Sequence, residues 1–474
     1  MPSTLSKKTK FYYGAGYAAW AAKDACFQFF LFFYYSQILG LSASLAGLAA
    51  LLALIADGIS DPIIGHLSDR WKSKKWGRRH PFMMWSVVPF CLGVFAIFNP
   101  PAELSQWQLF SWYLIMAILV RTSLTFFTVP HMALGAELSD SYHERTSIAV
   151  YRTVLGFFCG LLIQVVAWFV LIPHATAQGD LASGYVSTGV FAITVAFVGM
   201  LMAILGSKSR IPYLHQIGDE QSHRPWYSAF SDLIGLMKVD SSRIFLLANL
   251  VIATAIGISN TMLIHVNSFY YGFSSEQMGI FMLCIAFALP FASLLSVKVS
   301  RAMGKTRAIV LFLIITALIG PIPVLLHLYG FLPETGSNQL LLVVCIFVVL
   351  SQSFYIAHAN ILGAMVPDIA DDLASQNGMR QEGILNSAMM LTQKVTFGFG
   401  TFMAGLMIDF AGFDGVESAS EVSHDMMLKL GWMYGPGIAI LVLVGAWVYS
   451  KYSLSPERYM AIRQQLDGSI SSQL

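Results

Sequence analysis

Two carboxylates, four residues apart, lie inside an apolar stretch of the chain. Asp57 and Asp61 fall within residues 43–67, a stretch long enough to cross a lipid bilayer as a helix. On a helix this spacing places both side chains on one face. Because an ionised carboxylate at membrane depth costs about 2.5–3.5 kcal/mol, the pair requires a cation, a proton or a water-filled cavity. It predicts a site for a monovalent cation or a proton or, alternatively, a structural ion pair with Lys394.

A second charged pair, Lys23 and Asp24, lies in the first apolar stretch. Adjacent residues on a helix point about 100° apart, so at least one of these side chains must face the protein interior. A carboxylate accepts hydrogen bonds and an ammonium group donates them, which suits a polyhydroxylated ligand. The alternative is a charge network that holds helices together.

The composition indicates a membrane protein with many spans. Charged residues make up 11% of the 474 residues and hydrophobic residues 56%, whereas soluble domains carry about 25% charged residues. Apolar stretches predict an all-α protein with twelve transmembrane helices, at residues 11–38, 43–67, 82–99, 107–136, 147–172, 185–206, 244–272, 276–300, 306–330, 338–366, 383–412 and 426–450.

Lysine and arginine gather at both ends of the chain and in alternate connections between the predicted helices. Cytoplasmic loops are enriched in these residues, so both termini are expected in the cytoplasm. The expected location is a plasma membrane, taken to be a bacterial inner membrane. The net charge of +2 follows from this topology and gives no support for nucleic-acid binding. The expected partners are the bilayer and a small solute, and no signal indicates an oligomeric state.

The longest polar connection, residues 207–243, divides the chain into two halves. We expect a six-helix bundle at 1–206, a cytoplasmic loop at 207–243, a second six-helix bundle at 244–453 and a cytoplasmic tail at 454–474. A short basic turn follows the second helix of each half. Two parallel six-helix repeats are the organisation of the major facilitator fold, in which the substrate site lies between the halves.

Several motifs resemble those of the glycoside-pentoside-hexuronide:cation symporters, the melibiose-permease-like family. The longest are Asp57-Gly-Ile-Ser-Asp61-Pro-Ile-Ile-Gly65 and Gly77-Arg78-Arg79-His80-Pro81. Shorter matches continue along the chain at 14–24, 129–134, 137–140, 144–146, 151–152, 368–371 and 380–383, and at Lys394. The order and number of these matches make the resemblance specific.

The resemblance implies that the aspartate pair binds the coupling ion. Asp57 and Asp61 match the second-helix aspartates that bind Na⁺ or H⁺, Thr125 falls where the family has a fourth-helix hydroxyl ligand, and Lys394 matches a lysine near that site. Carboxylates and hydroxyls, here including that of Ser60, suit a hard cation. No other cofactor is expected.

The resemblance also implies a sugar site at Lys23, Asp24 and Arg152. Trp20 and His131 are candidate stacking surfaces, although aromatic side chains on spanning helices more often serve packing. The melibiose branch has an aspartate, a tryptophan and an arginine where this chain has Thr128, Met132 and Leu54, so a solute other than melibiose is expected, with Thr128 among its contacts.

Charged residues at the cytoplasmic ends of the predicted helices are candidates for a gate that opens and closes as the halves rock. The alternative is simple enrichment of positive charge on the cytoplasmic side. The gating candidates are Asp69, Arg70, Arg78, Arg79, Glu137, Asp140, Glu144 and Arg145.

Together these features predict a secondary symporter that takes up a small polar solute with Na⁺ or H⁺ by alternating access, and a glycoside is the expected solute. A lysolipid carrier of the same superfamily is the alternative within transporters. A non-transporting sensor or an intramembrane enzyme is the alternative from another class. We expect no enzyme activity, since the chain contains neither His-Glu-x-x-His nor Gly-x-Ser-x-Gly.

Overall fold

The computed structural model describes residues 5–213, 234–377, 382–413, 421–452 and 458–462, apart from residues 72, 74 and 140, together with residues 416, 454 and 464. This part of the chain is helical and contains no strand. The chain divides into two compact units, Met1–Trp226 and Tyr227–Leu474. Helix α9 ends at Ser207 and α11 begins at Asp240, which agrees with a connection near the predicted central loop at 207–243. Residues 214–233, which make up most of this loop, lie outside the described residues.

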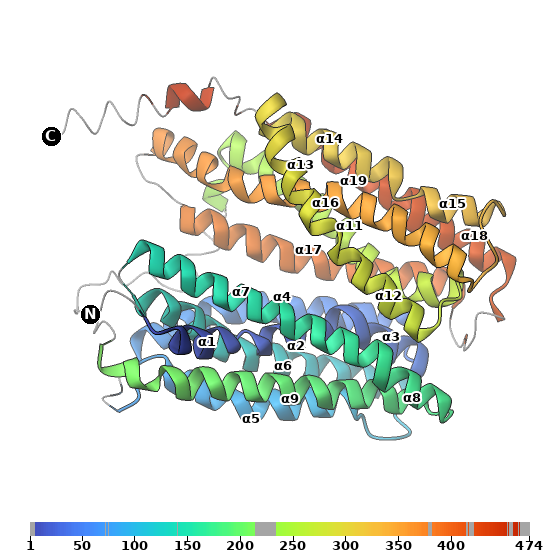
Figure 1. Ribbon diagram of the computed structural model, residues 1–474, viewed down its shortest axis with the longest axis horizontal. Helices are drawn as coiled ribbons and strands as arrows, with labels where there is room; N and C mark the ends of the chain where they lie inside the picture. The colour runs from blue at the N-terminus through green and yellow to red at the C-terminus, as the bar shows by residue number, and fades with distance from the viewer. Residues whose placement is uncertain are drawn as a thin grey trace. The chain divides into compact units, whose positions relative to one another are not determined.

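The N-terminal unit is a helical bundle whose long members run side by side (Figure 1). Its α-helices are α1 (Lys7–Ala15), α2 (Ala18–Ala25), α3 (Leu31–Phe33), α4 (Ala43–Arg70), α5 (His80–Phe98), α6 (Gln106–Glu137), α7 (Tyr142–Val166), α8 (Ile172–Ala177) and α9 (Leu181–Ser207). Three π-helical turns and one 3₁₀ turn complete it: η1 (Cys26–Phe30), η2 (Tyr34–Ile38), η3 (Ala167–Leu171) and η4 (Lys208–Tyr213).

The C-terminal unit is a second helical bundle. Its elements are α11 (Asp240–His265), η5 (Val266–Tyr270), α12 (Ser275–Ala286), α13 (Ala288–Met303), α14 (Lys305–Ile319), α15 (Ile322–Leu328), α16 (Asn338–Asn377), α17 (Glu382–Ala411), α18 (His424–Trp432), η7 (Met433–Gly437) and α19 (Ile438–Ser450). Within it, α11 packs on α17 and α19, and α16 packs on α13 and α14.

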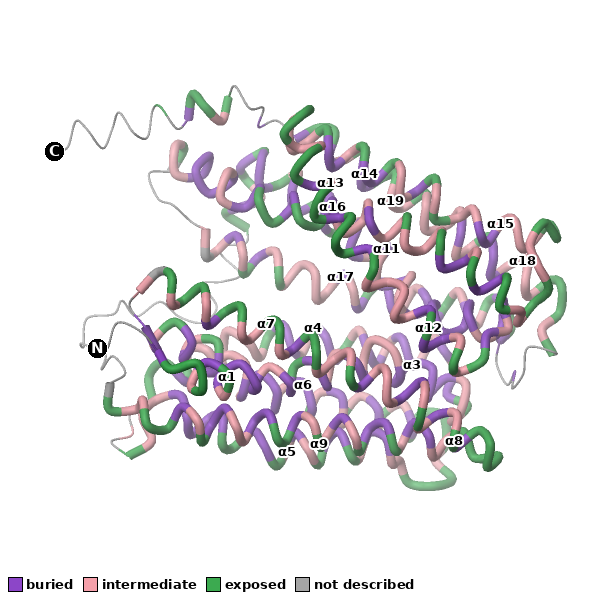
Figure 2. Tube along the Cα trace, viewed as in Figure 1, coloured by how far each residue is buried: buried purple, intermediate pink, exposed green. Residues whose placement is uncertain are grey.

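Ten helices in the described part of the chain are long and apolar enough to cross a membrane. They correspond to ten of the twelve predicted spans. The other two, 11–38 and 383–412, are helical as well but are not among these ten. The first is divided into short pieces, because a turn at Gly16 and Tyr17 separates α1 from α2 and π-helical turns follow. Figure 2 shows buried and exposed stretches alternating along the outer helices, as expected for helices with one face on a bundle.

Local sequence accounts for the boundaries of the two helices that carry the aspartates and Thr125. Helix α4 begins after Ser42, whose hydroxyl accepts from the Leu45 backbone N–H, and α6 begins with a capping box between Ser105 and Gln108. Pro62 lies within α4 directly after Asp61, where it removes one backbone donor from the helix. Helices α4 and α6 pack along each other, so residues of these helices can share one site.

The second and third long helices of each unit are joined by a turn that contains a glycine with positive φ. Gly77 has φ of 64° and Gly304 has φ of 85°, a conformation that side chains other than glycine adopt with difficulty. Each glycine lies within the basic turn that the sequence repeats in the two halves. The repeated turns therefore share a glycine in a positive-φ conformation as well as positive charge.

Candidate functional site

The carboxylates of Asp57 and Asp61 converge on the hydroxyl of Thr125. The Thr125 Oγ1 atom lies 3.2 Å from Asp57 Oδ1, 3.0 Å from Asp61 Oδ1 and 3.2 Å from the backbone carbonyl oxygen of Arg121. A hydroxyl carries a single hydrogen, so Thr125 can donate fully to only one of these three acceptors at a time. The result is a group of oxygens from α4 and α6 whose negative charge exceeds what Thr125 can satisfy.

Arg121 is a member of this site that the sequence did not single out. Its Nη1 atom lies 3.7 Å from Asp57 Oδ2, and the two side chains are only 7% and 10% exposed. The guanidinium carbon lies 4.6 Å from the centre of the Phe27 ring, a cation–π arrangement. The signal was available: Arg121 precedes Thr125 by four residues and so lies on the same face of α6.

The other two predicted cation ligands lie differently. The Ser60 hydroxyl donates a 3.0 Å hydrogen bond to the backbone carbonyl of Asp57, so the structure does not bring it onto the carboxylates. Lys394 lies on α17 in the C-terminal unit, where it is partly buried.

Four side chains form a ladder in which two stacked rings lie between two cations: Arg152 of α7, Tyr17 directly before α2, and Trp20 and Lys23 of α2. The Arg152 guanidinium lies 5.3 Å from the ring centre of Tyr17, which stacks on Trp20 at 5.0 Å with 12° between the ring planes. The Lys23 ammonium lies 5.5 Å from the Trp20 ring on its own helix. Tyr17 was not predicted from the sequence, although it precedes Trp20 by three residues and therefore lies about one helical turn before it.

The ladder ends in a carboxylate. Lys23 Nζ lies 3.3 Å from Asp24 Oδ1, and Gln28 donates a 2.7 Å hydrogen bond to Asp24 Oδ2. Gln28 belongs to η1, the π-helical turn that also carries Phe27, and such turns are frequent at functional sites. Phe27, the ring that faces the Arg121 guanidinium, follows Asp24 by three residues in the chain.

Two predicted solute contacts, Thr128 and His131, are bonded elsewhere. The Thr128 hydroxyl donates to the backbone carbonyl of Leu124 at 3.0 Å, the usual bond of a threonine in a membrane helix. His131 is buried, stacks on Tyr13 at 4.3 Å and donates from Nε2 to the Tyr13 carbonyl oxygen at 2.8 Å. These contacts give His131 a role in packing α6 against α1.

Four of the eight gating candidates, Asp69, Arg78, Arg79 and Glu137, form a compact network around Glu137. Arg79 donates to Glu137 Oε1 from Nε at 3.2 Å and from Nη2 at 3.0 Å, and Arg78 Nη2 lies 2.5 Å from the same oxygen. Arg79 Nη1 also lies 2.6 Å from Asp69 Oδ1 and 2.9 Å from the Ser68 hydroxyl. The network ties the end of α4 and the basic turn to the end of α6.

The hydrogen bonds and ion pairs of Glu144 and Arg145 are made to residues outside the Glu137 network. Glu144 pairs with Lys10 at 2.8 Å, and Arg145 donates to the Ser139 backbone carbonyl at 2.7 Å. Arg70 is exposed at the end of α4. Asp140 lies outside the described residues.

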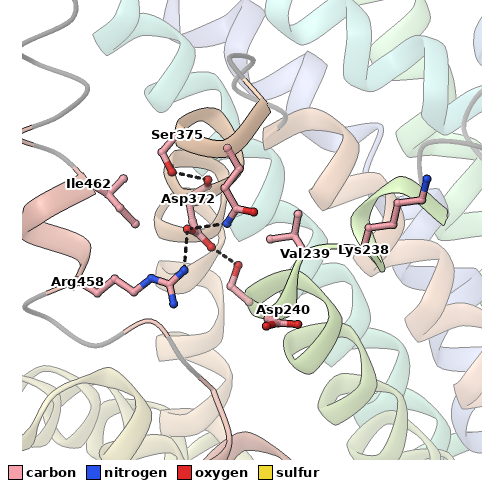
Figure 3. A pocket seen from close by; sticks show the side chains of 9 residues that line it. Lys238, Val239, Asp240, Asp372, Ser375, Arg458 and Ile462 are labelled. Carbon is pink, nitrogen blue, oxygen red and sulfur yellow. Dashed lines mark hydrogen bonds and ion pairs between the residues drawn. The ribbon is translucent and has the colours of Figure 1, made fainter.

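The C-terminal unit has a polar pocket of about 460 Å³ at one end of α11 and α16 (Figure 3). Its buried carboxylate, Asp372, accepts hydrogen bonds from Ser241 at 2.5 Å and Gln376 at 3.1 Å, and Arg458 Nη2 lies 3.8 Å away. Ile462 lines the pocket and is buried in the core of this unit. The pocket therefore joins part of the predicted tail to the helices rather than presenting an unsatisfied group.

The tail makes further buried contacts. Tyr452 and Leu454 belong to the same hydrophobic core as Leu373 of α16. Burial, together with the nearby carboxylates of Asp368 and Asp372, raises the pKa of the Tyr452 phenol above its ordinary value. The buried residues Tyr452, Leu454 and Ile462 therefore contribute to the packing of this unit.

Comparisons with known proteins agree with a transporter. The family model described as MFS/sugar transport protein matches residues 12–456. The putative glycoside/cation symporter YagG of Escherichia coli is 23% identical, covering 98% of this chain and 95% of that protein. The sodium-dependent lysophosphatidylcholine symporter 1-B of Danio rerio is 24% identical, covering 98% and 90%.

A solved structure shows the same fold. The inward-open xylose transporter XylE from E. coli superposes with a TM-score of 0.59 at 13% identity, covering 97% of this chain and 98% of that one. The family match extends over both bundles and over every residue of the Asp57 site, the aromatic ladder and the Glu137 network. The chain is therefore a member of the MFS/sugar transport protein family, a family of membrane transporters with the major facilitator fold.

Proposed function

We propose that this protein is a secondary symporter that couples uptake of a small polar solute, a glycoside, to Na⁺ or H⁺. The observation that carries the proposal is the convergence of Asp57 and Asp61 on one Thr125 hydroxyl, at 3.2 and 3.0 Å. Paired carboxylates at membrane depth are costly unless a cation or proton compensates them. The free-energy cost of the uncompensated carboxylates favours binding of the ion at this site, and transport couples the loading and release of that ion to movement of the solute.

The oxygen set suits either coupling ion. Carboxylate and hydroxyl oxygens are the ligands that a hard cation such as Na⁺ prefers. A proton is the alternative, because neighbouring carboxylates favour protonation of one member of the pair. The expected contribution of Lys394 stays a prediction, and Lys394→Gln tests it through the cation dependence of transport.

We place the solute on the ladder formed by Arg152, Tyr17, Trp20 and Lys23, with Asp24 at its end. Stacked rings offer an apolar face, while the cations donate and the carboxylate accepts hydrogen bonds, as a polyhydroxylated ring requires. Trp20 is 37% exposed, so its ring is accessible within the N-terminal unit. Charge-assisted bonds to Asp24 are stronger than neutral ones and would dominate solute orientation.

Coupling then follows from linkage between the two sites. If the cation raises solute affinity by some factor, the solute raises cation affinity by the same factor. We propose alternating access as the transport mechanism, with the Glu137 network stabilising one state of the cytoplasmic ends. We further propose a bacterial inner membrane location with both termini in the cytoplasm.

A solute panel tests the proposed class. The purified full chain is reconstituted into proteoliposomes, and uptake of pentosides, hexosides, hexuronides and lysophosphatidylcholine is measured with and without inward Na⁺ and H⁺ gradients. Gradient-driven accumulation of a glycoside, lost in Asp24→Asn, supports the proposal. Accumulation of no solute would leave the non-transporting sensor as the better interpretation.

A lysolipid carrier is the second candidate, because the Danio rerio relative is named as a lysophosphatidylcholine symporter and matches nearly the whole chain. The charged ladder favours a polar solute over an acyl chain, since buried charges need polar partners. Transport of lysophosphatidylcholine without transport of any glycoside would establish this second candidate.

A further inference from the structure

Among the described buried residues of the N-terminal unit are two arginines, Arg79 and Arg121, and they differ in how closely their guanidinium groups approach their partners. Arg79 contacts Asp69, Ser68 and Glu137 at distances between 2.6 and 3.2 Å. Arg121 approaches Asp57 only to 3.7 Å, beyond the 2.7–3.2 Å range of an N–H···O hydrogen bond. Its Nε is buried and has no hydrogen-bond partner.

The unsatisfied donor matters because Arg121 is 7% exposed. A buried guanidinium whose Nε has no partner loses part of the hydration it would have in water, and the 3.7 Å approach to Asp57 replaces that hydration only weakly. The Phe27 ring, 4.6 Å from the guanidinium carbon, supports the guanidinium plane without using an N–H group. Arg121 is thus supported from one side and only loosely paired on the other.

The partner of this loose pair is the carboxylate that the proposed function assigns to the coupling ion. Asp57 presents Oδ1 to Thr125 and Oδ2 to Arg121. Unit charges about 4 Å apart interact strongly even at an effective dielectric constant of about 20. The guanidinium therefore lies in the negative potential of Asp57 that would also attract an incoming cation. The guanidinium and the cation must therefore compete.

We propose that Arg121 is a displaceable internal counter-ion that competes with the coupling cation for Asp57. This inference rests on the proposed cation-coupled function and adds to it a residue that sets the affinity of the site. In the empty site Arg121 compensates Asp57. On cation binding it releases Asp57, and its guanidinium donors, including the unsatisfied Nε, become free to bind another acceptor. The arrangement keeps the carboxylate pair compensated in the empty carrier, which the transport cycle requires.

The competition predicts a gain of affinity when the guanidinium is removed. In Arg121→Gln, Na⁺ affinity of the purified full chain, measured by isothermal titration calorimetry at fixed pH, should rise by about tenfold or more, because the competing charge is gone. Arg121→Lys keeps the charge and should stay within about threefold of wild type on the same electrostatic grounds. Arg243→Gln, which breaks an exposed pair with Asp240, is the matched control and should leave Na⁺ affinity unchanged.

A double variant provides a control in case Arg121→Gln alone does not fold. Arg121→Gln leaves Asp57 without its arginine, whereas the double variant Asp57→Asn, Arg121→Gln removes both charges. The double variant should fold and should show no gain of Na⁺ affinity over Asp57→Asn alone. Unchanged or weaker Na⁺ affinity in folded Arg121→Gln, absence of Na⁺ binding in both wild type and Arg121→Gln, or an equal gain in the double variant would overturn the competition. Failure of the proposed function is distinct, since it appears as absence of gradient-driven solute accumulation in the wild type.

Discussion

Arg79 donates two hydrogen bonds to one carboxylate oxygen of Glu137, at 3.2 Å from Nε and 3.0 Å from Nη2. The other oxygen of Glu137 is buried without a hydrogen-bond partner. One acidic side chain thus compensates Arg79 and also Arg78, whose Nη2 atom reaches the same oxygen. The end of α6 is tied to the basic turn through a single group.

We therefore expect Glu137→Gln to be strongly destabilising. Removing the carboxylate leaves two neighbouring arginines without it, and breaking a buried pair typically costs about 3–5 kcal/mol. Thermal unfolding of the purified protein in detergent measures the effect. The control is Glu276→Gln at an exposed position, for which we expect a change within about 0.5 kcal/mol. Equal effects of the two substitutions would mean that the network does not stabilise the fold.

Thr125→Val should weaken cation binding while preserving the shape of the side chain. The hydroxyl contacts both carboxylates, and its loss leaves them less compensated by about 1–3 kcal/mol, which is about 5- to 150-fold in affinity. The measurement is the Na⁺ or H⁺ concentration that gives half-maximal transport. Thr125→Ser keeps the hydroxyl and serves as the control. A valine variant with wild-type cation dependence would remove Thr125 from the site.

Asp24→Asn should raise the solute concentration needed for half-maximal transport by about tenfold or more, because a charge-assisted hydrogen bond is lost. Trp20→Ala should act in the same direction through loss of the stacking face, whereas Trp107→Ala, at a position 67% exposed, should not. The cation dependence of all three variants should stay near that of wild type. Unchanged solute dependence in both ladder variants would place the solute elsewhere.

Ser241→Ala should destabilise the C-terminal unit by about 1–3 kcal/mol, because it leaves the buried Asp372 carboxylate with one fewer donor. Arg458→Gln should cost less than about 1 kcal/mol, since Arg458 is 50% exposed and lies 3.8 Å from Asp372. Thermal unfolding of the two variants compares these effects. A larger loss in Arg458→Gln would show that the tail contact, rather than the α11–α16 contact, secures this end of the unit.

Much of the fold could be predicted from the sequence, because length and apolarity dominate the behaviour of a chain in a bilayer. Ten predicted spans are described as long apolar helices. The breaks in residues 11–38 could not be predicted in the same way. That segment contains no proline, and its π-helical turns at 26–30 and 34–38 depend on packing against other helices rather than on a local breaker.

Candidate site residues that share one helix face could be predicted from their spacing. Residues whose role depends on how two helices pack together were missed. Asp57 and Asp61 follow from their spacing, and the resemblance added Thr125. Arg121 was not predicted as a site residue, because its role depends on its approach to Asp57 where α4 and α6 pack together. Thr128 was predicted as a solute contact from alignment with a family carboxylate, and it stays a prediction. Its hydroxyl donates to the Leu124 carbonyl within its own helix.

The central claim is that Asp57 and Asp61 bind the ion that drives transport. Its most direct test is solute-driven cation uptake into proteoliposomes of the full chain, measured as external Na⁺ and pH are varied independently. We expect the wild type to take up Na⁺ or H⁺ together with solute, and Asp57→Asn and Asp61→Asn each to lose this uptake and all concentrative accumulation. If each variant kept cation-coupled accumulation at the wild-type level, the aspartate pair would not be the coupling site.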